Sequence, residues 1–472
     1  MAVAQCIVPV ALDHSTTHNP RGGGPVLKQI LKGARVLVAG GGLAGLTAAG
    51  DLIDCGADVH VIEPRSRLGG RVWTIRDDGF GRIPLEAGGE FIDGEHQAIR
   101  KLCADLGLQL QQILREGFGL ALDLRGRVQL FKTQKQIWGD FKRALAKEAE
   151  AFEASACDWS SSAASSIGRH SLDAVLRARQ AGDDVRAMAQ GLRGFYLADS
   201  DQISALPGVE LSLQPKDPGH VTLARIKGGN DRLVEKLAAK KGVKISLQLE
   251  VKRVAHDHRG VTLSVADRNG KLSALKGDYL VMAAPAPIVR DLEFTPALPS
   301  SLRQALKALS DGPATKAHLL FDRSWWRTPG HPQAWGSNLD TGAIWEAAGA
   351  RPGVLTMLAG GRASKAFRDL LEDGGPQRLV RRLSWLGEPE EVRDFRSTTW
   401  ELDRFARAGY AVFGPGFKPE WRSELSRSAG RIAFAGDHTS RDWQGYMNGA
   451  VESGARAARD IETMRLMEGI TG

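Results

Sequence analysis

The stretch that decides the fold lies near the start of the chain and reads Val36-Leu37-Val38-Ala39-Gly40-Gly41-Gly42-Leu43-Ala44-Gly45. Its four apolar residues predict a buried parallel strand, and the Ala/Leu-rich segment 43–55 predicts a helix. The glycines form a GxGxxG motif in which Gly40 permits the tight turn, Gly42 lets the backbone approach a pyrophosphate, and Gly45 lets the helix pack on the strand. The motif predicts a dinucleotide site at the helix N-terminus, whose dipole favours an anion.

A second strand, predicted over 59–62, ends at Glu63, at the distance from Gly40 where this motif carries an acid that binds a ribose diol. Arg65 and the turn Gly69-Gly70-Arg71 follow. Guanidinium groups neutralise a pyrophosphate, and paired glycines let the chain pass closely along an extended cofactor. This second turn favours FAD over NAD.

The rest of the chain alternates between helical and strand patterns. Helices are predicted over 97–106, 136–154, 172–179, 185–195 and 446–467, with a Ser/Ala-rich loop at 159–166. Strands are predicted over 244–249, 261–265, 279–283, 317–321, 355–358 and 432–435. We therefore predict an α/β fold in which a Rossmann-like FAD-binding domain is interleaved with an α+β substrate-binding domain that carries a mixed sheet and helices. The predicted limits are 1–33 for an N-terminal arm, 34–93, 220–290 and 400–472 for the FAD-binding domain, and 94–219 and 291–399 for the substrate-binding domain.

Composition excludes several classes of protein. The chain has 472 residues, 42% hydrophobic and 25% charged, as in ordinary globular proteins. The net charge of +8 is spread without a basic run, so no nucleic-acid partner is predicted. No apolar run approaches about 18 residues, so no membrane span is predicted. Four cysteines without a CxxC favour reduced thiols, a cytoplasmic location and no metal site.

Later segments resemble, in chain order, those of the flavin-dependent amine oxidases. They are 85–92 with its Gly88-Gly89 turn, 225–233, 250–251, 282–285, 434–437 and 445–454, so that the resemblance covers roughly residues 34–465. It implies a soluble, bacterial-type flavoprotein. The cofactor-binding residues that it implies are Gly40, Gly42, Gly45, Glu63, Arg65, Gly70, Arg71, Gly88, Gly89, Glu90, Val251, Trp400, Gly436, Asp437 and Met447.

The resemblance also implies three catalytic residues: Lys316, Tyr410 and Tyr446. In the family, a lysine holds a water against flavin N5, and two tyrosine rings form a slot that leads an amine to the flavin. The expected reaction converts a primary or secondary amine to an imine by hydride transfer to N5. The imine hydrolyses to an aldehyde or ketone, and O2 or a redox protein reoxidises the flavin. Mitochondrial-type members carry a covalently linked cysteine before the first tyrosine, where this chain has Gly409, so FAD is expected to be non-covalent.

Substrate recognition leaves alternatives open. Phe91 and Asp93 are candidate substrate-binding residues, although Asp93 is also a good type of helix cap. An L-amino-acid oxidase is the main rival, but such enzymes carry an arginine near the position of Glu90-Phe91, to pair with the substrate carboxylate. A carotenoid-type oxidoreductase, a chromatin demethylase and a non-catalytic flavin-fold binding protein rank lower. The oligomeric state is left open, with a homodimer as one alternative.

Overall fold

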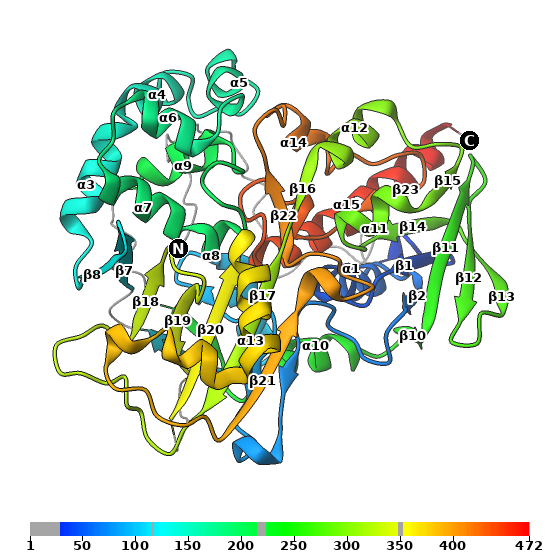
Figure 1. Ribbon diagram of the computed structural model, residues 1–472. Helices are drawn as coiled ribbons and strands as arrows, with labels where there is room; N and C mark the ends of the chain where they lie inside the picture. Colours follow the sequence, from blue (N-terminus) through cyan, green and yellow to red (C-terminus); the bar gives the residue numbers. More distant parts are fainter. Residues whose placement is uncertain (1–28, 115–117, 215–222, 348–352, 472) are drawn as a thin grey trace.

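A five-stranded parallel sheet forms the centre of one half of the molecule. The computed structural model describes residues 29–114, 118–214, 223–347 and 353–471 (Figure 1). In this sheet the strand order is β10-β2-β1-β14-β23, and every neighbouring pair is parallel. The three central strands are buried along almost their whole length, which accounts for their continuous apolar sequences. The bounds are β1 Arg35–Ala39, β2 Asp58–Glu63, β10 Lys244–Leu247, β14 Tyr279–Met282 and β23 Ile432–Phe434.

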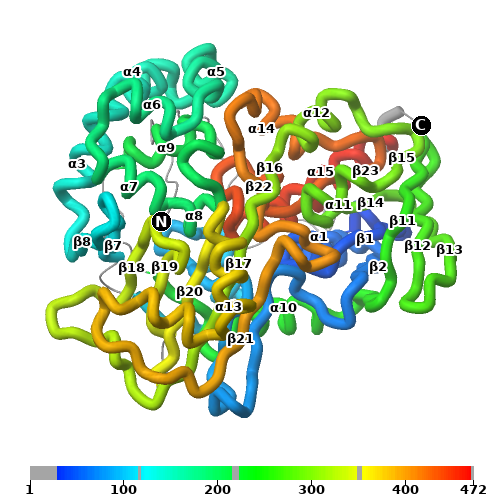
Figure 2. The backbone as a smooth tube through the Cα atoms, viewed as in Figure 1, coloured from blue at the N-terminus to red at the C-terminus, as the bar shows by residue number. Residues whose placement is uncertain are grey.

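Two helices from opposite ends of the chain pack together beside this sheet. They are α1 (Leu43–Asp54) and α15 (Met447–Thr471). Gly454 permits their close approach, because a Cβ atom at this position would lie 2.3 Å from the carbonyl oxygen of Ala44. Figure 2 shows the blue N-terminal and red C-terminal segments side by side. The predicted α/β class, in which the first and last segments join one layer, is therefore confirmed.

The second large sheet has seven strands in the order β21-β17-β20-β19-β18-β7-β8. Its strands are β7 Gly119–Leu124, β8 Arg127–Phe131, β17 Ala314–Leu320, β18 Ala334–Ser337, β19 Ala343–Glu346, β20 Val354–Gly360 and β21 Asp394–Thr399. The residues of β17 are all buried. Sequence patterns predict no strand between 94 and 219, whereas β7 and β8 form there, because their short alternating sequences pair with each other and β7 pairs with the distant β18.

Helices from the middle of the chain gather beside the seven-stranded sheet (Figure 1). Their bounds are α3 Lys135–Ala144, α4 Ala146–Glu153, α5 Ser162–Gly168, α6 Leu172–Ala178, α7 Asp183–Gly191, α8 Arg193–Tyr196 and α9 Ala205–Ser212. The loop predicted over 159–166 was partly wrong, because Ser161 accepts a hydrogen bond from the backbone N–H of Ala164 and so caps α5. The helices predicted over 136–154 and 185–195 each form two helices.

Smaller elements complete the molecule. The remaining strands are β3 Thr74–Ile75, β4 Leu85–Glu86, β5 Ile92–Asp93, β6 Leu110–Leu114, β9 Leu223–Ile226, β11 Leu249–His256, β12 Val261–Asp267, β13 Leu272–Gly277, β15 Glu293–Thr295, β16 Leu309–Gly312 and β22 Tyr410–Phe413. The remaining helices are α2 Gln97–Asp105, α10 Asp231–Ala238, α11 Ala286–Asp291, α12 Ser300–Ala308, α13 Arg362–Arg381 and α14 Trp421–Glu424. The domain limits stay a prediction. The sheet β5-β9-β6 joins residues on both sides of two predicted limits.

The predicted N-terminal arm lies outside the described residues except for 29–33, where Leu31 is fully buried and donates a backbone hydrogen bond to Cys55. Cys55 and Cys103 are free thiols, but Cys157 is disulfide-bonded, so the expectation of four reduced cysteines was wrong. In the part of the chain that the structure describes, no helix combines the length and apolar composition that a membrane span needs.

Candidate active site

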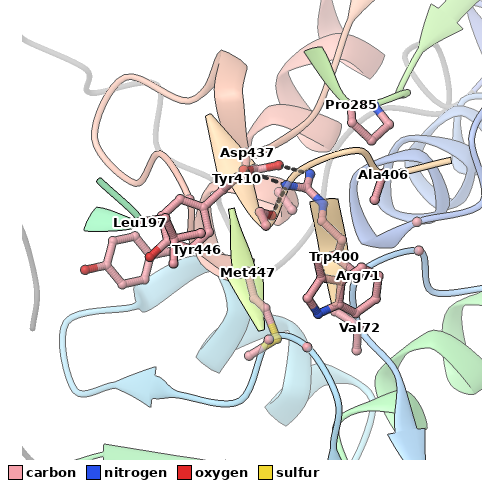
Figure 3. Close-up of a pocket in the computed structure, with 18 of the residues that line it drawn as sticks. Arg71, Val72, Leu197, Pro285, Trp400, Ala406, Tyr410, Asp437, Tyr446 and Met447 are labelled. Carbon is pink, nitrogen blue, oxygen red and sulfur yellow. Dashed lines mark hydrogen bonds and ion pairs between the residues drawn. The ribbon is translucent and has the colours of Figure 1, made fainter. Parts of the chain in front are cut away.

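A cavity of about 380 Å³ lies between the two large sheets and collects most of the predicted site residues. One part of its lining comes from the elements around the five-stranded sheet, at the turn after β1, the end of β2 and the start of α15. Another part comes from α7, α8 and the strands β7, β18, β19 and β20. Figure 3 shows side chains from several of these elements converging on one space.

The three glycines of the first turn have different structural reasons to be glycine. Gly40 has φ +116°, a conformation that L side chains rarely adopt, and a Cβ atom there would lie 2.8 Å from the Ala283 oxygen. A Cβ atom at Gly45 would lie 2.0 Å from the Gly40 oxygen, so Gly45 serves packing and does not line the cavity. A Cβ atom at Gly42 would lie 3.9 Å from the Gly69 oxygen, an ordinary van der Waals contact, so protein packing does not require glycine at this position, which lines the cavity.

Glu63 holds the turn in place. Its carboxylate accepts hydrogen bonds from the backbone N–H groups of Gly41, at 2.8 Å, and Arg65, at 3.0 Å. The Arg65 guanidinium in turn donates to Asp403 and lies 3.5 Å from Glu63. Glu63 is 2% exposed and lines the cavity, as does Val251, so the acid after β2 and the later strand segment meet the glycine turn as predicted.

Arg71 and Asp437 connect the second glycine turn to the C-terminal segment. The Arg71 guanidinium donates to both carboxylate oxygens of Asp437, and it donates to the Gly409 oxygen at 2.7 Å (Figure 3). Bidentate pairs of this kind fix geometry as well as charge. Gly70 and Gly436 lie beside this pair in the lining, so three segments far apart in the sequence meet at one place.

The Gly88-Gly89 turn forms another wall. A Cβ atom at Gly88 would lie 1.9 Å from the Arg71 oxygen, and at Gly89 it would lie 3.0 Å from the Met447 side chain. The Trp400 indole, which also lines the cavity, donates to the Ala87 oxygen at 2.9 Å and so holds the start of this turn. Only glycine fits at Gly88, where the clash is with backbone, whereas a side chain at Gly89 would require the flexible Met447 to move; both glycines line the cavity with their backbone.

Lys316 reaches this turn from the middle of β17. Its Nζ donates to Glu90 Oε2 at 2.6 Å and to the Gly88 oxygen at 3.2 Å. Glu90 is fully enclosed and also lies 3.7 Å from Arg225. Burial opposes ionisation of the Glu90 carboxyl, but the charges of Lys316 and Arg225 outweigh it and lower its pKa. The two residues line the cavity as a buried ion pair.

Tyr410 and Tyr446 both line the cavity, and Figure 3 shows them among the converging side chains. The Tyr410 hydroxyl donates to the Phe195 oxygen, and its ring packs against Gly445, where a Cβ atom would lie 3.0 Å from it. The Tyr446 ring contacts His96 edge-on, with centroids 5.0 Å apart. Burial raises the pKa of both phenols above its usual value, so both rings stay neutral.

Sequence reasoning missed the apolar part of the lining. It is formed by Phe118, Leu120, Trp138, Met188, Leu192, Phe195, Leu197, Leu223, Ala343, Trp345 and Leu358, with Phe91 among the predicted residues. Trp345 contacts Phe91 at a centroid distance of 5.1 Å and lies over the Lys316 ammonium at 5.2 Å. Apolar residues on strands and helices carry no local signal of their cavity role, because the same residues fill any core.

Of the predicted site residues, two do not line the cavity: Gly45, as described above, and Asp93. The cap interpretation was also wrong, because α2 begins at Gln97 and His96 precedes it without a side-chain cap. Asp93 lies in β5 and accepts a hydrogen bond from the Glu95 N–H, and its own N–H donates to His96 Nδ1. Its carboxyl therefore shapes the turn between β5 and α2.

One buried acid next to the site is expected to make stability pH-dependent. Burial raises the pKa of Glu86 from 4.5 to about 7, although it accepts hydrogen bonds from Asn230 and Thr74. Between pH 4.5 and 7 the folded state then binds more protons than the unfolded state, so the free energy of unfolding falls as pH rises through this window, by roughly 3 kcal/mol. Glu86→Gln mimics the protonated form and should flatten the pH dependence of the melting temperature.

The control is Glu95→Gln, which changes an exposed acid of the same segment. Melting curves from pH 5 to 8 check the prediction. An equal slope in Glu86→Gln and in the unaltered protein would contradict it.

The comparisons with known proteins agree with this geometry. The model of the family described as flavin containing amine oxidoreductase matches residues 43–462. The chain is 27% identical to the flavin-containing monoamine oxidase AofH of Mycobacterium tuberculosis, over 91% of this chain and 96% of that protein. It is 27% identical to the L-amino-acid oxidase of Mus musculus, over 92% of this chain and 71% of that protein.

Among solved structures, the cyclohexylamine oxidase from Brevibacterium oxydans IH-35A has the same fold, with a TM-score of 0.78 and 23% identity over 91% of this chain and 99% of that one. The match covers the seven-stranded sheet, four of the five strands of the parallel sheet and the cavity lining from Leu43 to Ala450. The chain therefore belongs to the flavin-containing amine oxidoreductase family and is a flavin-dependent oxidoreductase that acts on amines.

Proposed function

We propose that the protein is an FAD-dependent amine oxidase that converts a primary or secondary amine and O2 into an imine and H2O2, and that the imine then hydrolyses to an aldehyde or ketone. One observation carries the proposal: Lys316, Tyr410 and Tyr446 line the same cavity as the Gly40–Gly42 turn. The end of the cavity at the Gly40–Gly42 turn, here called the cofactor end, is thus continuous with the end at Lys316, Tyr410 and Tyr446, here called the reacting end. When bound, FAD supplies the acceptor for two electrons and a hydrogen from the carbon next to nitrogen.

The residues present fit FAD. Gly42 lines the cavity, and a Cβ atom there would meet its nearest neighbour, the Gly69 oxygen, only at 3.9 Å, which leaves room for a pyrophosphate at the N-terminus of α1. Glu63 would receive the ribose hydroxyls, and Arg71 with Asp437 would border the middle of the cofactor. The Gly88-Gly89 turn and Met447 would lie beside the ring system. Of the fifteen predicted cofactor residues, Gly45 alone would act through packing.

FAD is held without a covalent bond in this proposal. Gly409 offers no side chain, and a Cβ atom there would lie 2.4 Å from Leu197 and 2.8 Å from Ala314. We therefore expect denaturation by heat or acid to release all of the flavin into the supernatant, where its fluorescence measures it. Flavin that stays with the precipitated protein would contradict this prediction.

The chain's own side chains bind the amine and exclude water. Tyr410 and Tyr446 present neutral rings, and the apolar lining around them favours an uncharged amine over its ammonium form. Lys316 places a cation near the Gly88-Gly89 turn, where it stabilises negative charge that develops on dioxygen as it takes up electrons. The protein thus contributes positioning, desolvation and charge placement.

The charges of the lining favour an amine over an amino acid. Each of the three arginines in the described lining already pairs with a carboxylate: Arg65 with Asp403, Arg71 with Asp437 and Arg404 with Glu250. The apolar part of the described lining holds no guanidinium that could bind a substrate carboxylate. Asp93 is not part of the described lining, and the carboxylate nearest its apolar part, Glu90, already pairs with Lys316, so a second ammonium group on the substrate would compete with that pair.

A peroxide-coupled screen of purified protein tests the proposal. We expect monoamines with an apolar substituent to be oxidised with kcat/KM at least about 100-fold higher than diamines or L-amino acids, because burying an unpaired charge costs several kcal/mol. Bleaching of the flavin under anaerobic conditions reports the amine step separately from the O2 step. Turnover of L-amino acids alone would overturn the proposed substrate class. A homodimer and a cytoplasmic location stay predictions.

A further inference from the structure

Glu90 occupies an unusual place for a carboxylate, because it is buried beside the cavity between two cations. Its side chain is 3% exposed, with Oε2 2.6 Å from Lys316 Nζ and Oε1 3.7 Å from an Arg225 guanidinium nitrogen. The Trp345 indole nitrogen lies 3.4 Å from Oε1. The three partners come from β9, β17 and β19, so the tertiary fold, and not a local turn, assembles this cluster.

The Lys316 ammonium is only partly used by this cluster. An ammonium group has three N–H donors, of which one meets Glu90 and one meets the Gly88 oxygen. Among the described residues the third has no hydrogen-bond partner, and Lys316 lines the cavity. An incompletely paired cation at a cavity wall is suited to act on something inside the cavity.

We propose that Glu90 is a positioning residue that keeps Lys316 charged and holds its ammonium against the Gly88-Gly89 turn. This inference rests on the proposed function and reassigns Glu90, whose carboxylate is directed to Lys316 rather than to the cofactor. Glu90 lies between Lys316 and Arg225, which contact different oxygens of its carboxylate, so removing its charge would leave a cation on either side of position 90. Lys316 would then lose its proton more easily, since a like charge and burial both disfavour the ammonium.

The other titratable groups near Lys316 do not replace Glu90. Burial lowers the pKa of His318 to about 3, so this histidine, which contacts Thr356 and the Glu86 oxygen, is neutral at physiological pH. Burial raises the pKa of Glu86 to about 7, and its oxygens already accept from Asn230 and Thr74. The charges that face Lys316 from β9, β17 and the segment 86–90 are therefore those of Glu90 and Arg225, with Glu86 adding a negative charge that favours the ammonium as it ionises near pH 7.

The test compares holoenzyme variants over pH 6 to 9, with the rate of flavin reoxidation by O2 and the midpoint potential of the bound flavin as readouts. The unaltered protein should show a nearly flat reoxidation rate. Glu90→Gln should lose about ten-fold of this rate between pH 6 and 9, as Lys316 loses its proton, and its potential should show a break in the same range. Lys316→Met should be slow and flat at every pH, with or without Glu90→Gln.

The substitution Arg225→Gln distinguishes an electrostatic role of Glu90 toward Lys316 from a role in packing alone. In the double variant Glu90→Gln, Arg225→Gln the repulsion from Arg225 is also gone while Lys316 stays buried, so the fall in rate should lie at higher pH than in Glu90→Gln. If the single variant Glu90→Gln does not fold, the pH profile of the double variant still tests whether Glu90 keeps Lys316 charged. A Glu90→Gln profile as flat as that of the unaltered protein, or a double variant whose fall in rate lies at the same pH as in Glu90→Gln or lower, would overturn the inference.

The failure of the proposed function would look different. Unaltered protein that binds no flavin, or whose bound flavin no amine reduces, would overturn the proposed function. Yellow, amine-reducible protein with an unchanged Glu90→Gln profile overturns only the role of Glu90.

Discussion

Gly42→Val is expected to give a folded protein without flavin. At Gly42 the backbone has φ −78° and ψ 179°, which valine adopts without strain, and the nearest protein atom to an added Cβ lies 3.9 Å away. The new Cβ atom would therefore meet its nearest protein neighbour, the Gly69 oxygen, at an ordinary van der Waals distance. The valine side chain would fill the space where the pyrophosphate is proposed to approach the backbone at the N-terminus of α1. We expect loss of at least about 99% of the bound flavin, equivalent to roughly 3 kcal/mol of binding free energy.

The matched control is Gly45→Ala, three residues along the same turn. Its methyl group would lie 2.0 Å from the Gly40 oxygen, so it should lower the melting temperature by overpacking, at a cost of about 1–3 kcal/mol. Absorbance at the flavin band and circular dichroism of both variants check the pair. Gly42→Val protein that is as yellow as the unaltered protein would refute the proposed position of the cofactor.

Lys316→Met is expected to slow reoxidation of the flavin by O2 by roughly 10²–10³-fold, the usual effect of removing one preorganised charge from a site that excludes water. The anaerobic reduction by amine should change far less, because Tyr410, Tyr446 and the apolar lining stay in place. Methionine retains most of the lysine stem within the buried strand β17. Glu90 keeps its contact with Arg225, which limits the cost of leaving its charge behind.

Stopped-flow measurement of the two half-reactions tests this expectation. Lys365→Met serves as the control, since Lys365 is an exposed lysine on α13 that pairs with Asp369 and lies outside the cavity lining. If Lys316→Met left the O2 step unchanged and slowed only the amine step, Lys316 would act on the substrate side, and its proposed role would be wrong.

Local motifs predicted the cofactor end of the site well, for a physical reason. Gly40, Gly42 and Glu63 act through a single strand–turn–helix–strand unit, in which spacing along the chain sets spacing in space. Lys316, Tyr410 and Tyr446 came from resemblance, because nothing in their local sequence distinguishes them from core residues. Asp93 was placed too close to the substrate, since spacing in sequence does not show which way a side chain points at the end of β5.

By itself, the sequence determined the α/β class, the glycine turn at the start of α1 and the acid that follows β2. These features depend on backbone conformation and short-range periodicity, which each segment carries within itself. Only the tertiary structure decided that β7 and β8 are strands, that Glu90 faces Lys316 and Arg225, and that the reacting end of the cavity is apolar. Each of these features depends on contacts between segments more than 100 residues apart in the sequence. Local sequence patterns do not predict such contacts.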